Sequence, residues 1–391
     1  MSDLIRIPGS RIVEVSRLAF GRPDVALLCF GESDEPSPAA ARDAAVAALH
    51  AGETRYSDVR GLPELRHALA DYLTGLHAKL VTEDRVQVTA SGMTAVAVAL
   101  SAILRPGDRV VMHMPLWPNL PNAARLRGAR IDEIALDAAG DGGFRLDLER
   151  LAGKLPGARA LVLNTPNNPT GWTATAGELE TILALCRRHG VWLVSDEVYS
   201  RLVYDGSAAA PSLLDVATPE DRVIVCNSFS KTWTMTGWRL GWMVLPAGGR
   251  DAVSEIVEVT HSGVAPFIQR GGIAALADAG SVERFRAHCG WGRDLASAAL
   301  AGLGGVRYAA PEGAFYAFIG VEGASDSLAL AKRLVTEHGV AVAPGSAFGV
   351  AGEGYLRLCF AQSEAVLQRA MERLRAGLRG VRATQDYGFV K

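Results

Sequence analysis

Lys231 is the residue whose surroundings most clearly favour covalent chemistry. It ends the run Ser-Phe-Ser-Lys that begins at Ser228, directly after an apolar stretch that predicts a buried strand, and Arg239 follows eight positions later. An amine must lose its proton before it condenses with an aldehyde, and both desolvation and nearby positive charge lower the pKa of a lysine. We expect Arg239 to supply such charge. A lone lysine is normally a solvated surface cation, but this arrangement is that of a Schiff-base lysine beside a phosphate site.

Polar residues also follow two other predicted strands. The segment 164–171 reads Asn-Thr-Pro-Asn-Asn-Pro-Thr-Gly and contains Asn168, while Asp196 and Tyr199 come after the apolar run 192–195. Ligands of open α/β sheets bind at the carboxyl ends of the strands, so both segments should face one crevice. Taken alone, such a turn is usually only a turn, and an acidic residue after a strand is more often a helix N-cap.

A third junction, Ala-Ser-Gly-Met-Thr, joins a predicted strand to a helix and contains Ser91, Gly92 and Met93. The backbone amides and the dipole at a helix N-terminus can receive a phosphate, although a glycine at such a turn is as often needed for geometry alone. Trp117 follows another predicted strand. Its indole could stack on a planar ring or pack in the core.

Arg357 lies inside the apolar strand pattern Tyr-Leu-Arg-Leu-Cys-Phe. A buried arginine without a partner is costly, so we expect it to meet a carboxylate in fork geometry. That carboxylate could belong to a protein side chain or to a substrate. The eight histidines show no metal-ligand spacing, and no glycine-rich run has the dinucleotide-binding or P-loop form.

The first two thirds of the chain alternate between strand and helix patterns. Short apolar or β-branched runs predict strands at 86–89, 109–112, 130–134, 160–164, 192–195, 223–227 and 241–245. Helical patterns occur at 39–50, 93–103, 119–126, 176–189 and 251–259. This alternation predicts parallel strands joined by crossover helices, and hence an α/β fold with a mostly parallel, doubly wound sheet.

After about residue 280 the pattern changes to that of a smaller α+β domain. It predicts a long helix at 281–303 and a second at 328–338, with strands at 306–309, 315–318, 340–343 and 355–360. At 391 residues the chain is long for one hydrophobic core, so two domains are expected. We place a large domain at 45–283 and a small domain at 1–44 and 284–391.

The composition is that of an ordinary globular protein with a small-molecule partner. Hydrophobic residues make up 49%, charged residues 21%, and the net charge is −2 with both signs mixed along the chain, which argues against a nucleic-acid or membrane surface. The five cysteines are odd in number and lie far apart, as reduced, buried thiols do. Residues 1–9 carry no secretion signal pattern, so we expect a cytoplasmic protein.

Together these motifs resemble the class I/II aminotransferases of PLP fold type I, the aspartate aminotransferase family. The resemblance covers nearly the whole chain, in the order Gly31-Glu32, Tyr56, Ser91–Met93, Trp117, Asn164–Gly171, Asp196–Tyr199, Ser228–Arg239 and Arg357. The combination of a strand followed by Ser-x-Ser-Lys and an arginine with the Asn-Pro-Thr-Gly turn and Asp-x-x-Tyr is highly specific. The resemblance implies pyridoxal 5′-phosphate (PLP) as the cofactor.

It also implies a role for each matching residue. Lys231 would form the aldimine with PLP and shuttle a proton, Asp196 would hold the pyridinium proton, and Asn168 and Tyr199 would bind the ring oxygen. The phosphate would be held by Ser91, Ser228, Ser230, Arg239 and the amides of Gly92 and Met93. Trp117 would stack on the ring, and the substrate would meet Gly31, Trp117, Asn168 and Arg357. Tyr56 would reach the phosphate of a neighbouring subunit, which implies a homodimer with shared active sites.

The expected reaction moves an amino group from an L-amino acid to a 2-oxo acid. Lyases, decarboxylases and cyclising enzymes of the same fold share the lysine, the aspartate and the phosphate residues, and they are the alternative. Two departures from the family pattern stand out. Met93 occupies a position where some members carry a hydroxyl, and no second arginine identifies a site for a distal carboxylate, so the substrate side chain stays open.

Overall fold

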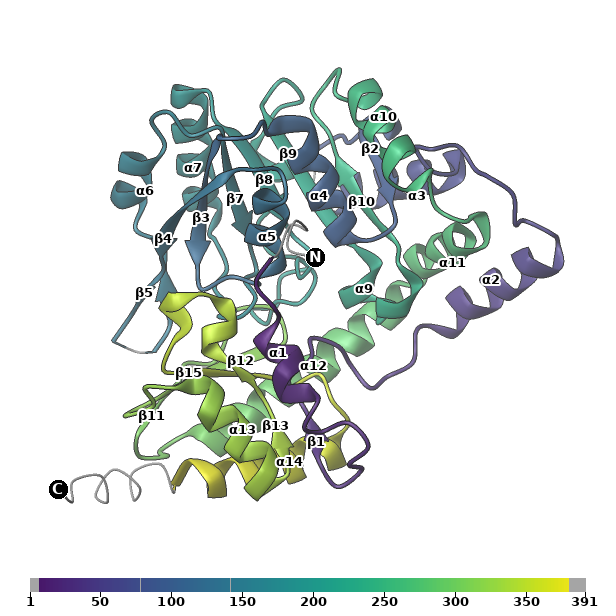
Figure 1. Ribbon diagram of the computed structural model, residues 1–391. Coiled ribbons are helices and arrows are strands. Elements are labelled where there is room, and N and C mark those ends of the chain that lie inside the picture. Colours follow the sequence, from purple (N-terminus) through teal and green to yellow (C-terminus); the bar gives the residue numbers. More distant parts are fainter. Residues whose placement is uncertain (1–6, 78, 141, 380–391) are drawn as a thin grey trace, which may run out of the picture.

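The computed structural model describes residues 7–77, 79–140 and 142–379, and its largest feature is a seven-stranded sheet (Figure 1). The strand order is β2-β10-β9-β8-β7-β3-β4. The strands are β2 (Val86–Thr89), β3 (Arg109–Met114), β4 (Arg130–Ala135), β7 (Ala160–Asn164), β8 (Trp192–Asp196), β9 (Val223–Ser228) and β10 (Gly241–Val244). The expected α/β fold with a mostly parallel sheet is confirmed.

Helices cover both faces of this sheet. They are α3 (Pro63–His77), α4 (Gly92–Ile103), α5 (Asn119–Arg125), α6 (Leu148–Lys154), α7 (Ala176–His189), α8 (Leu213–Val216) and α10 (Arg250–His261). Alternate side chains of β3 show the two layers: Val110 and Met112 pack in one hydrophobic core with α4, α5 and α10, and Val111 packs in another with α3, α6 and α7. Successive side chains of a strand point to opposite faces, so the sheet is doubly wound.

The expectation of parallel strands is wrong for β10, which runs antiparallel to both β9 and β2. The link from β9 to β10 holds only the short helix α9 (Phe229–Thr232) and a 3₁₀ turn at Thr236–Trp238. A parallel return needs a crossover that spans the face of the sheet, and this link is too short to provide one. The same link carries Lys231, which lies just past the carboxyl end of β9 because it follows that strand directly.

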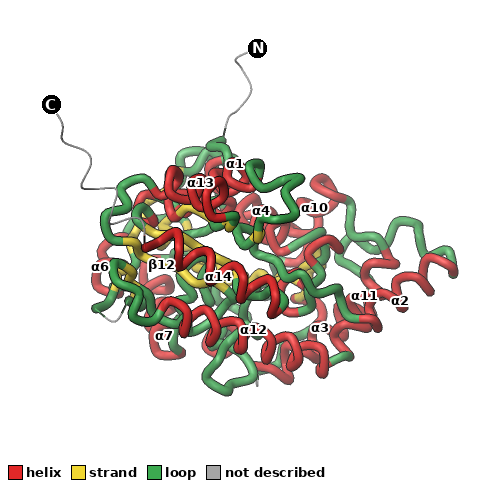
Figure 2. Tube along the Cα trace, turned by 90° about the horizontal axis from the view of Figure 1, so that it is seen from below, coloured by secondary structure: helices red, strands yellow, loops and turns green. Residues whose placement is uncertain are grey.

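A second sheet has the order β11-β12-β15-β14. Its strands are β11 (Val306–Arg307), β12 (Tyr316–Val321), β14 (Ala343–Pro344) and β15 (Tyr355–Cys359), and its helices are α12 (Ala279–Leu300), α13 (Ser327–His338) and α14 (Glu364–Arg379). Figure 2 shows these helices and β12 crowded together on one side of the molecule. Buried residues of the sheet and helices form a third core.

The N-terminal segment belongs with this smaller part. The short strand β1 (Ala26–Leu27) pairs with β13 (Val340–Ala341), and α1 (Arg11–Ser16) packs against α13 and β14. The domain division at residues 45 and 283 falls inside α2 (Ala39–His50) and α12, and it stays a proposal. Residues 1–6 and 380–391 of that division lie outside the described residues.

Two helices lie side by side away from the sheets. Helix α2 packs against α11 (Pro266–Ala277), and both views place the pair at the edge of the large part of the molecule (Figures 1 and 2). The two-residue strands β5 (Asp137–Ala138) and β6 (Phe144–Arg145) pair with each other in a small separate sheet. Among the described residues, no helix combines the length and apolar character needed to cross a membrane.

Candidate active site

A cavity of about 290 Å³ lies between the large sheet and the smaller one. It receives residues from the carboxyl ends of β7, β8 and β9, the N-terminus of α4, strands β12 and β15 of the smaller sheet, and the loop after β1. Of the residues singled out from the sequence, it is lined by Gly31, Ser91, Gly92, Met93, Trp117, Asn168, Asp196, Tyr199, Ser228, Ser230, Lys231, Arg239 and Arg357. Tyr56 is the exception.

Lys231 lines this cavity, and its amine is held by the loop after β1. Its Nζ donates a hydrogen bond of 2.6 Å to the carbonyl oxygen of Gly31. Burial and, to a smaller extent, the guanidinium of Arg357 lower the pKa of Lys231 to about 8, against the opposing effects of Cys359, Glu32 and Asp196. The expectation that Arg239 supplies this charge is wrong, because that side chain is solvent-exposed and Arg357 is the arginine that acts on the lysine.

Asp196 ends β8 at the floor of the cavity and is buried. Among the described residues its carboxylate accepts one long hydrogen bond, 3.4 Å from the backbone N–H of Val198. Burial raises the pKa of Asp196 to about 7. A carboxylate so poorly solvated is well suited to accept a hydrogen bond from a protonated ring nitrogen.

The N-terminus of α4 forms one side of a polar cup, defined here as Ser91–Met93, Ser228, Ser230 and Arg239. Ser91 caps the helix, since its Oγ accepts a hydrogen bond of 3.0 Å from the N–H of Thr94. The N–H groups of Gly92 and Met93 in the first turn have no intrahelical acceptor, so they are free to bind an anion. A Cβ on Gly241 would lie 2.5 Å from the backbone nitrogen of Gly92, which explains the glycine beside the cup.

The other side of the polar cup comes from the link between β9 and β10. The hydroxyls of Ser228 and Ser230 lie 2.9 Å apart, and Ser228 Oγ accepts a hydrogen bond of 3.1 Å from the N–H of Ser230. Arg239 adopts a left-handed backbone conformation with φ 57° and donates to the carbonyl oxygen of Thr236 at 2.5 Å. Among the described residues, no carboxylate lies within 4.0 Å of its guanidinium. The cup therefore combines hydroxyls, amides and one unpaired cation.

Asn168 is tied to several parts of the site at once. Its N–H donates to Asn164 Oδ1 at 2.8 Å, its carbonyl accepts from the N–H of Trp117 at 3.0 Å, and its Oδ1 accepts from Arg357 at 2.9 Å. Behind it, the N–H of Asn164 donates to His113 Nε2 at 3.0 Å. Burial lowers the pKa of His113 to about 4, so the imidazole stays neutral and can act as this acceptor. Sequence reasoning missed His113, because a lone histidine in an apolar strand carries no recognisable pattern.

Arg357 and Asn168 form a second polar group in the cavity, called here the buried arginine site. The Arg357 side chain is only 2% exposed, yet its Nη2 donates to the neutral carbonyl of Cys29 at 2.5 Å and its Nε has no hydrogen-bond partner. Its guanidinium lies 4.3 Å from the ring centre of Tyr316 and 4.9 Å from that of Phe348. Among the described residues no carboxylate lies within 4.0 Å of it. From the sequence alone, either a protein side chain or a substrate could supply the carboxylate for Arg357. The described protein residues do not supply it.

Tyr316 also lines the cavity, although it was not predicted from the sequence. Its hydroxyl lies 2.6 Å from that of Tyr199. Ile12 of α1 and Phe30 add apolar wall that was not foreseen either. A polar hydroxyl inside the apolar run Phe315-Tyr316-Ala-Phe-Ile is the signal that could have pointed to Tyr316, because a buried tyrosine normally finds a hydrogen-bond partner.

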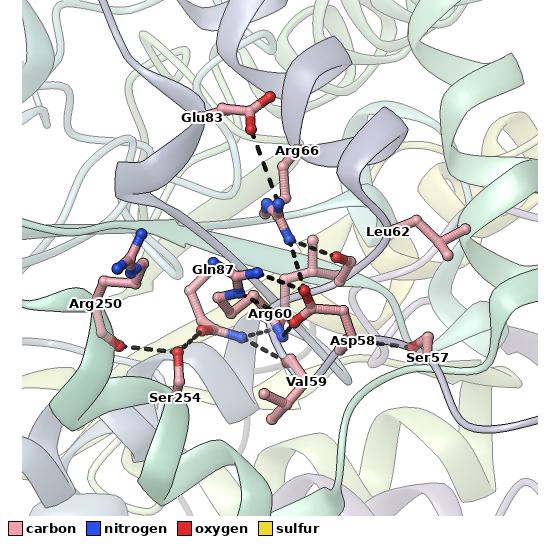
Figure 3. Close-up of polar contacts among 12 residues, drawn as sticks. Ser57, Asp58, Val59, Arg60, Leu62, Arg66, Glu83, Gln87, Arg250 and Ser254 are labelled. Atoms are coloured by element: carbon pink, nitrogen blue, oxygen red, sulfur yellow. Dashed lines mark hydrogen bonds and ion pairs between the residues drawn. The ribbon is translucent and has the colours of Figure 1, made fainter.

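Tyr56 lies outside the cavity. Its side chain is 94% exposed and faces a surface groove formed with residues 261–265 at the end of α10. Figure 3 shows how the adjoining loop is held: Asp58 accepts hydrogen bonds from Arg60 and Arg66, and Gln87 donates to the carbonyl of Val59 at 2.9 Å. The loop is therefore anchored in a polar network while its tyrosine points into solvent.

Comparison with known proteins identifies the family. A sequence model described as aminotransferase class I and II matches residues 23–374. This chain belongs to the class I and II aminotransferases. It is 33% identical to the arginine–pyruvate transaminase AruH of Pseudomonas aeruginosa, over 90% of this chain and 89% of that one. It is 35% identical to an aspartate aminotransferase of Thermotoga maritima, over 90% of both chains.

Solved structures of aminotransferases have the same fold. An aminotransferase from Mycobacterium tuberculosis superposes with a TM-score of 0.90 at 30% identity, covering 97% of this chain and all of the other (100%). The Thermotoga maritima aspartate aminotransferase gives a TM-score of 0.88 at 33% identity, with 95% and 98% covered. The family predicted from the motifs is confirmed, and with it the assignment of the chain as an aminotransferase. The relatives' names do not favour the alternative of a lyase, decarboxylase or cyclase.

Proposed function

We propose that this aminotransferase transfers an amino group from an L-amino acid to a 2-oxo acid, with PLP bound covalently to Lys231. The observation that carries this proposal is the buried arginine site. A guanidinium that is buried without an anion is costly unless a ligand supplies the anion, and amino acids and 2-oxo acids both carry the carboxylate it lacks. Because the same cavity contains an amine with a depressed pKa, carboxylate and reactive nitrogen can be held together.

The residues present fit PLP. The polar cup offers hydroxyls, helix amides and the unpaired Arg239 to a phosphate, which is the donor set that phosphates prefer. The nearly unsolvated carboxylate of Asp196 fits a protonated pyridine nitrogen, and Asn168 and Tyr199 offer donors for the ring oxygen. Trp117 provides an aromatic surface for the ring face. When bound, PLP supplies the electron sink that makes the substrate α-proton acidic.

Lys231 is proposed to act as the general acid–base that moves this proton. Its pKa of about 8 leaves an appreciable neutral fraction near neutral pH, as a general base requires. The hydrogen bond to the Gly31 carbonyl keeps Nζ in the cavity. Arg357 would hold the substrate carboxylate in place throughout, which favours transfer of the amino group over loss of carbon dioxide.

We further propose a homodimer in which Tyr56 reaches the phosphate of the neighbouring subunit. The exposed phenol and its anchored loop support this proposal, because an ordered aromatic side chain in solvent is typical of an interface residue. Ser57 Oγ donates to the Val264 carbonyl at 2.9 Å, and Gln269 Nε2 donates to the same carbonyl at 2.6 Å, so the loop is fixed to α11 as well (Figure 3 shows Ser57).

We also propose a cytoplasmic location and a small-molecule partner rather than nucleic acid or membrane. The five cysteines support a reducing compartment, because all of them are buried and free. The nearly balanced charge, −2 overall, supports a small-molecule partner.

Half-reaction spectroscopy tests the proposed reaction. PLP-loaded protein is mixed with each amino acid in turn, and the absorbance of the aldehyde form of the cofactor is followed together with that of its amine form. Conversion by a subset of amino acids, reversed by a 2-oxo acid, is the expected result. Release of ammonia, carbon dioxide or a cyclic product without formation of the amine form would contradict transamination.

A further inference from the structure

The two buried tyrosines of the cavity share a single hydrogen bond. Tyr199 follows β8 and Tyr316 begins β12, and their hydroxyl oxygens lie 2.6 Å apart. Their rings meet edge to face with centres 5.6 Å apart. Both side chains are buried, and among the described residues neither hydroxyl has another hydrogen-bond partner. Burial raises the pKa of both phenols, so both carry their protons at neutral pH.

Each hydroxyl has one proton to donate. If the Tyr199 hydroxyl donates its hydrogen bond to Tyr316, it cannot donate to an acceptor in the cavity. If Tyr316 is the donor, the Tyr199 proton is free for the ring oxygen of the cofactor. Hydrogen bonds in series also polarise one another, so a donor behind Tyr199 makes Tyr199 a stronger donor in turn.

Tyr316 cannot easily turn away from this role. Its hydroxyl sits directly against Gly31, where an added Cβ would lie only 2.0 Å from the phenol oxygen. Its ring packs against Phe315 with centres 4.9 Å apart and supports the Arg357 guanidinium at 4.3 Å on its face. One side chain therefore contacts the residue proposed for the ring oxygen and the residue proposed for the substrate carboxylate.

We propose that Tyr316 is a positioning residue that serves both ends of the site: its hydroxyl donates to Tyr199, and its ring face orients Arg357. The inference rests on the proposed function, since it presumes those roles of Tyr199 and Arg357. The two contacts of Tyr316 are separable, because Tyr316→Phe removes only the hydroxyl and Tyr316→Leu also removes the aromatic face.

The first test uses the pH-dependent absorbance of the bound cofactor in the loaded protein. The ring oxygen of the cofactor carries most negative charge after the nitrogen that links the cofactor to Lys231 has lost its proton. A hydrogen-bond donor to this oxygen therefore stabilises the deprotonated form. Removing the donor therefore raises the midpoint of the titration. We expect Tyr199→Phe to raise it clearly and Tyr316→Phe to raise it by about half a pH unit, the scale of one modest hydrogen bond.

The double variant distinguishes transmission through Tyr199 from an independent effect. We expect Tyr199→Phe with Tyr316→Phe to match Tyr199→Phe alone, because Tyr316 acts through Tyr199. A Tyr316→Phe protein with an unchanged midpoint, or a shift that adds fully to that of Tyr199→Phe, would overturn the inference. An unchanged midpoint in Tyr199→Phe would overturn it as well, since Tyr316 would then have nothing to transmit.

The second test concerns the ring face. We expect Tyr316→Leu to raise KM for the amino donor about ten-fold, as loss of a cation–π contact allows, while Tyr316→Phe stays within about two-fold of the parent. Equal KM values in the two variants would refute the role of the face. Tyr355→Phe is the matched control, because Tyr355 stacks on Phe318 in the same sheet and does not line the cavity. Melting temperatures and PLP affinity measured by equilibrium dialysis show whether each variant is folded.

A separate variant tests the proposed function on which the inference rests. A Lys231→Ala protein that still bound the cofactor covalently would contradict that function, whatever the tyrosine variants did. The tyrosine titrations therefore test Tyr316, and the lysine variant tests the reaction on which the inference rests.

Discussion

The polar cup and the buried arginine site are two proposed anion sites in one cavity, and they are built in different ways. The hydroxyls of the cup already take part in hydrogen bonds within the protein, and its amides belong to the first turn of a helix, where they have no intrahelical acceptor. Its one cation, Arg239, is exposed to solvent. The buried arginine site instead encloses a complete charge among neutral acceptors and two aromatic rings. A resident group can be held by many modest contacts, whereas exchange of substrates needs one strong contact that each substrate completes in turn.

Lys231 lines the same cavity as the two sites, and its removal should have the largest effect. We expect Lys231→Ala to lose transamination by about four orders of magnitude or more, because loss of a covalent and acid–base residue removes both of its contributions. The visible band of the covalently bound cofactor should disappear as well. Lys332→Ala, which removes a surface lysine paired with Glu14, is the matched control and should change neither. Retention of both signals would remove Lys231 from the mechanism.

Arg357→Ala should separate the two sites next. Loss of a buried, charge-assisted contact to the substrate carboxylate should weaken amino-acid binding by about 10² to 10³-fold. PLP affinity should change little, because the cup is untouched. Titration with an amino acid and dialysis against PLP measure the two quantities, and Arg357→Lys shows how much the fork geometry adds to the charge. A loss of PLP affinity with unchanged amino-acid binding would mean that the arginine is structural.

The depressed pKa of Lys231 predicts how cofactor-free protein captures PLP. The pKa falls from the usual 10.5 to about 8, so the reactive neutral amine is present above pH 8 and is lost as the pH falls below it. The capture rate should therefore rise with pH to a midpoint near 8, and at pH 7 it should exceed that of an ordinary lysine by about 100-fold or more. Stopped-flow absorbance from pH 6 to 10.5 measures it. A midpoint near 10.5 would show that burial does not tune this amine.

Arg239→Ala should weaken PLP binding and leave amino-acid binding unchanged, which is the reverse of Arg357→Ala, and the loss of affinity should be smaller. We expect PLP to bind about 10-fold more weakly, because the exposed guanidinium is screened by solvent and the hydroxyls and amides of the cup remain. Amino-acid binding to the loaded protein should stay near that of the parent. If Arg239→Ala weakened amino-acid binding instead, the division of labour between the two sites would be wrong.

Tyr56→Phe should have the smallest effect. If the hydroxyl reaches the phosphate of a neighbouring copy, PLP affinity should fall only a few-fold, the scale of one hydrogen bond. Sedimentation should show the same assembly as the parent, because the ring remains. Mixing Tyr56→Phe with Lys231→Ala subunits adds a sharper check: half of the mixed dimers' sites should combine an intact lysine with an intact tyrosine from the partner. Unchanged PLP affinity in Tyr56→Phe would place the tyrosine outside the site.

Much of the fold could be predicted from the sequence, because its signals are local. The strand 160–164 has the predicted bounds because it is a continuous apolar run buried on both faces. The helix 176–189 has the predicted bounds because Thr175 caps its N-terminus and Gly190 its C-terminus. Helices α3, α11 and α14 were missed, although each places apolar residues at helical spacing. The antiparallel turn of β10 was missed too, because direction depends on the length of a connection and not on the strand itself.

The sequence by itself determined which residues could act, because residue types and their places after strands follow from local patterns. Only the tertiary structure decided how they act on one another. Lys231 owes its lowered pKa to burial and to Arg357 from another sheet, and the buried arginine site joins Cys29, Asn168 and Tyr316 from segments far apart in the chain. Burial and distance depend on how the two sheets close around the cavity, and no local pattern records that closure.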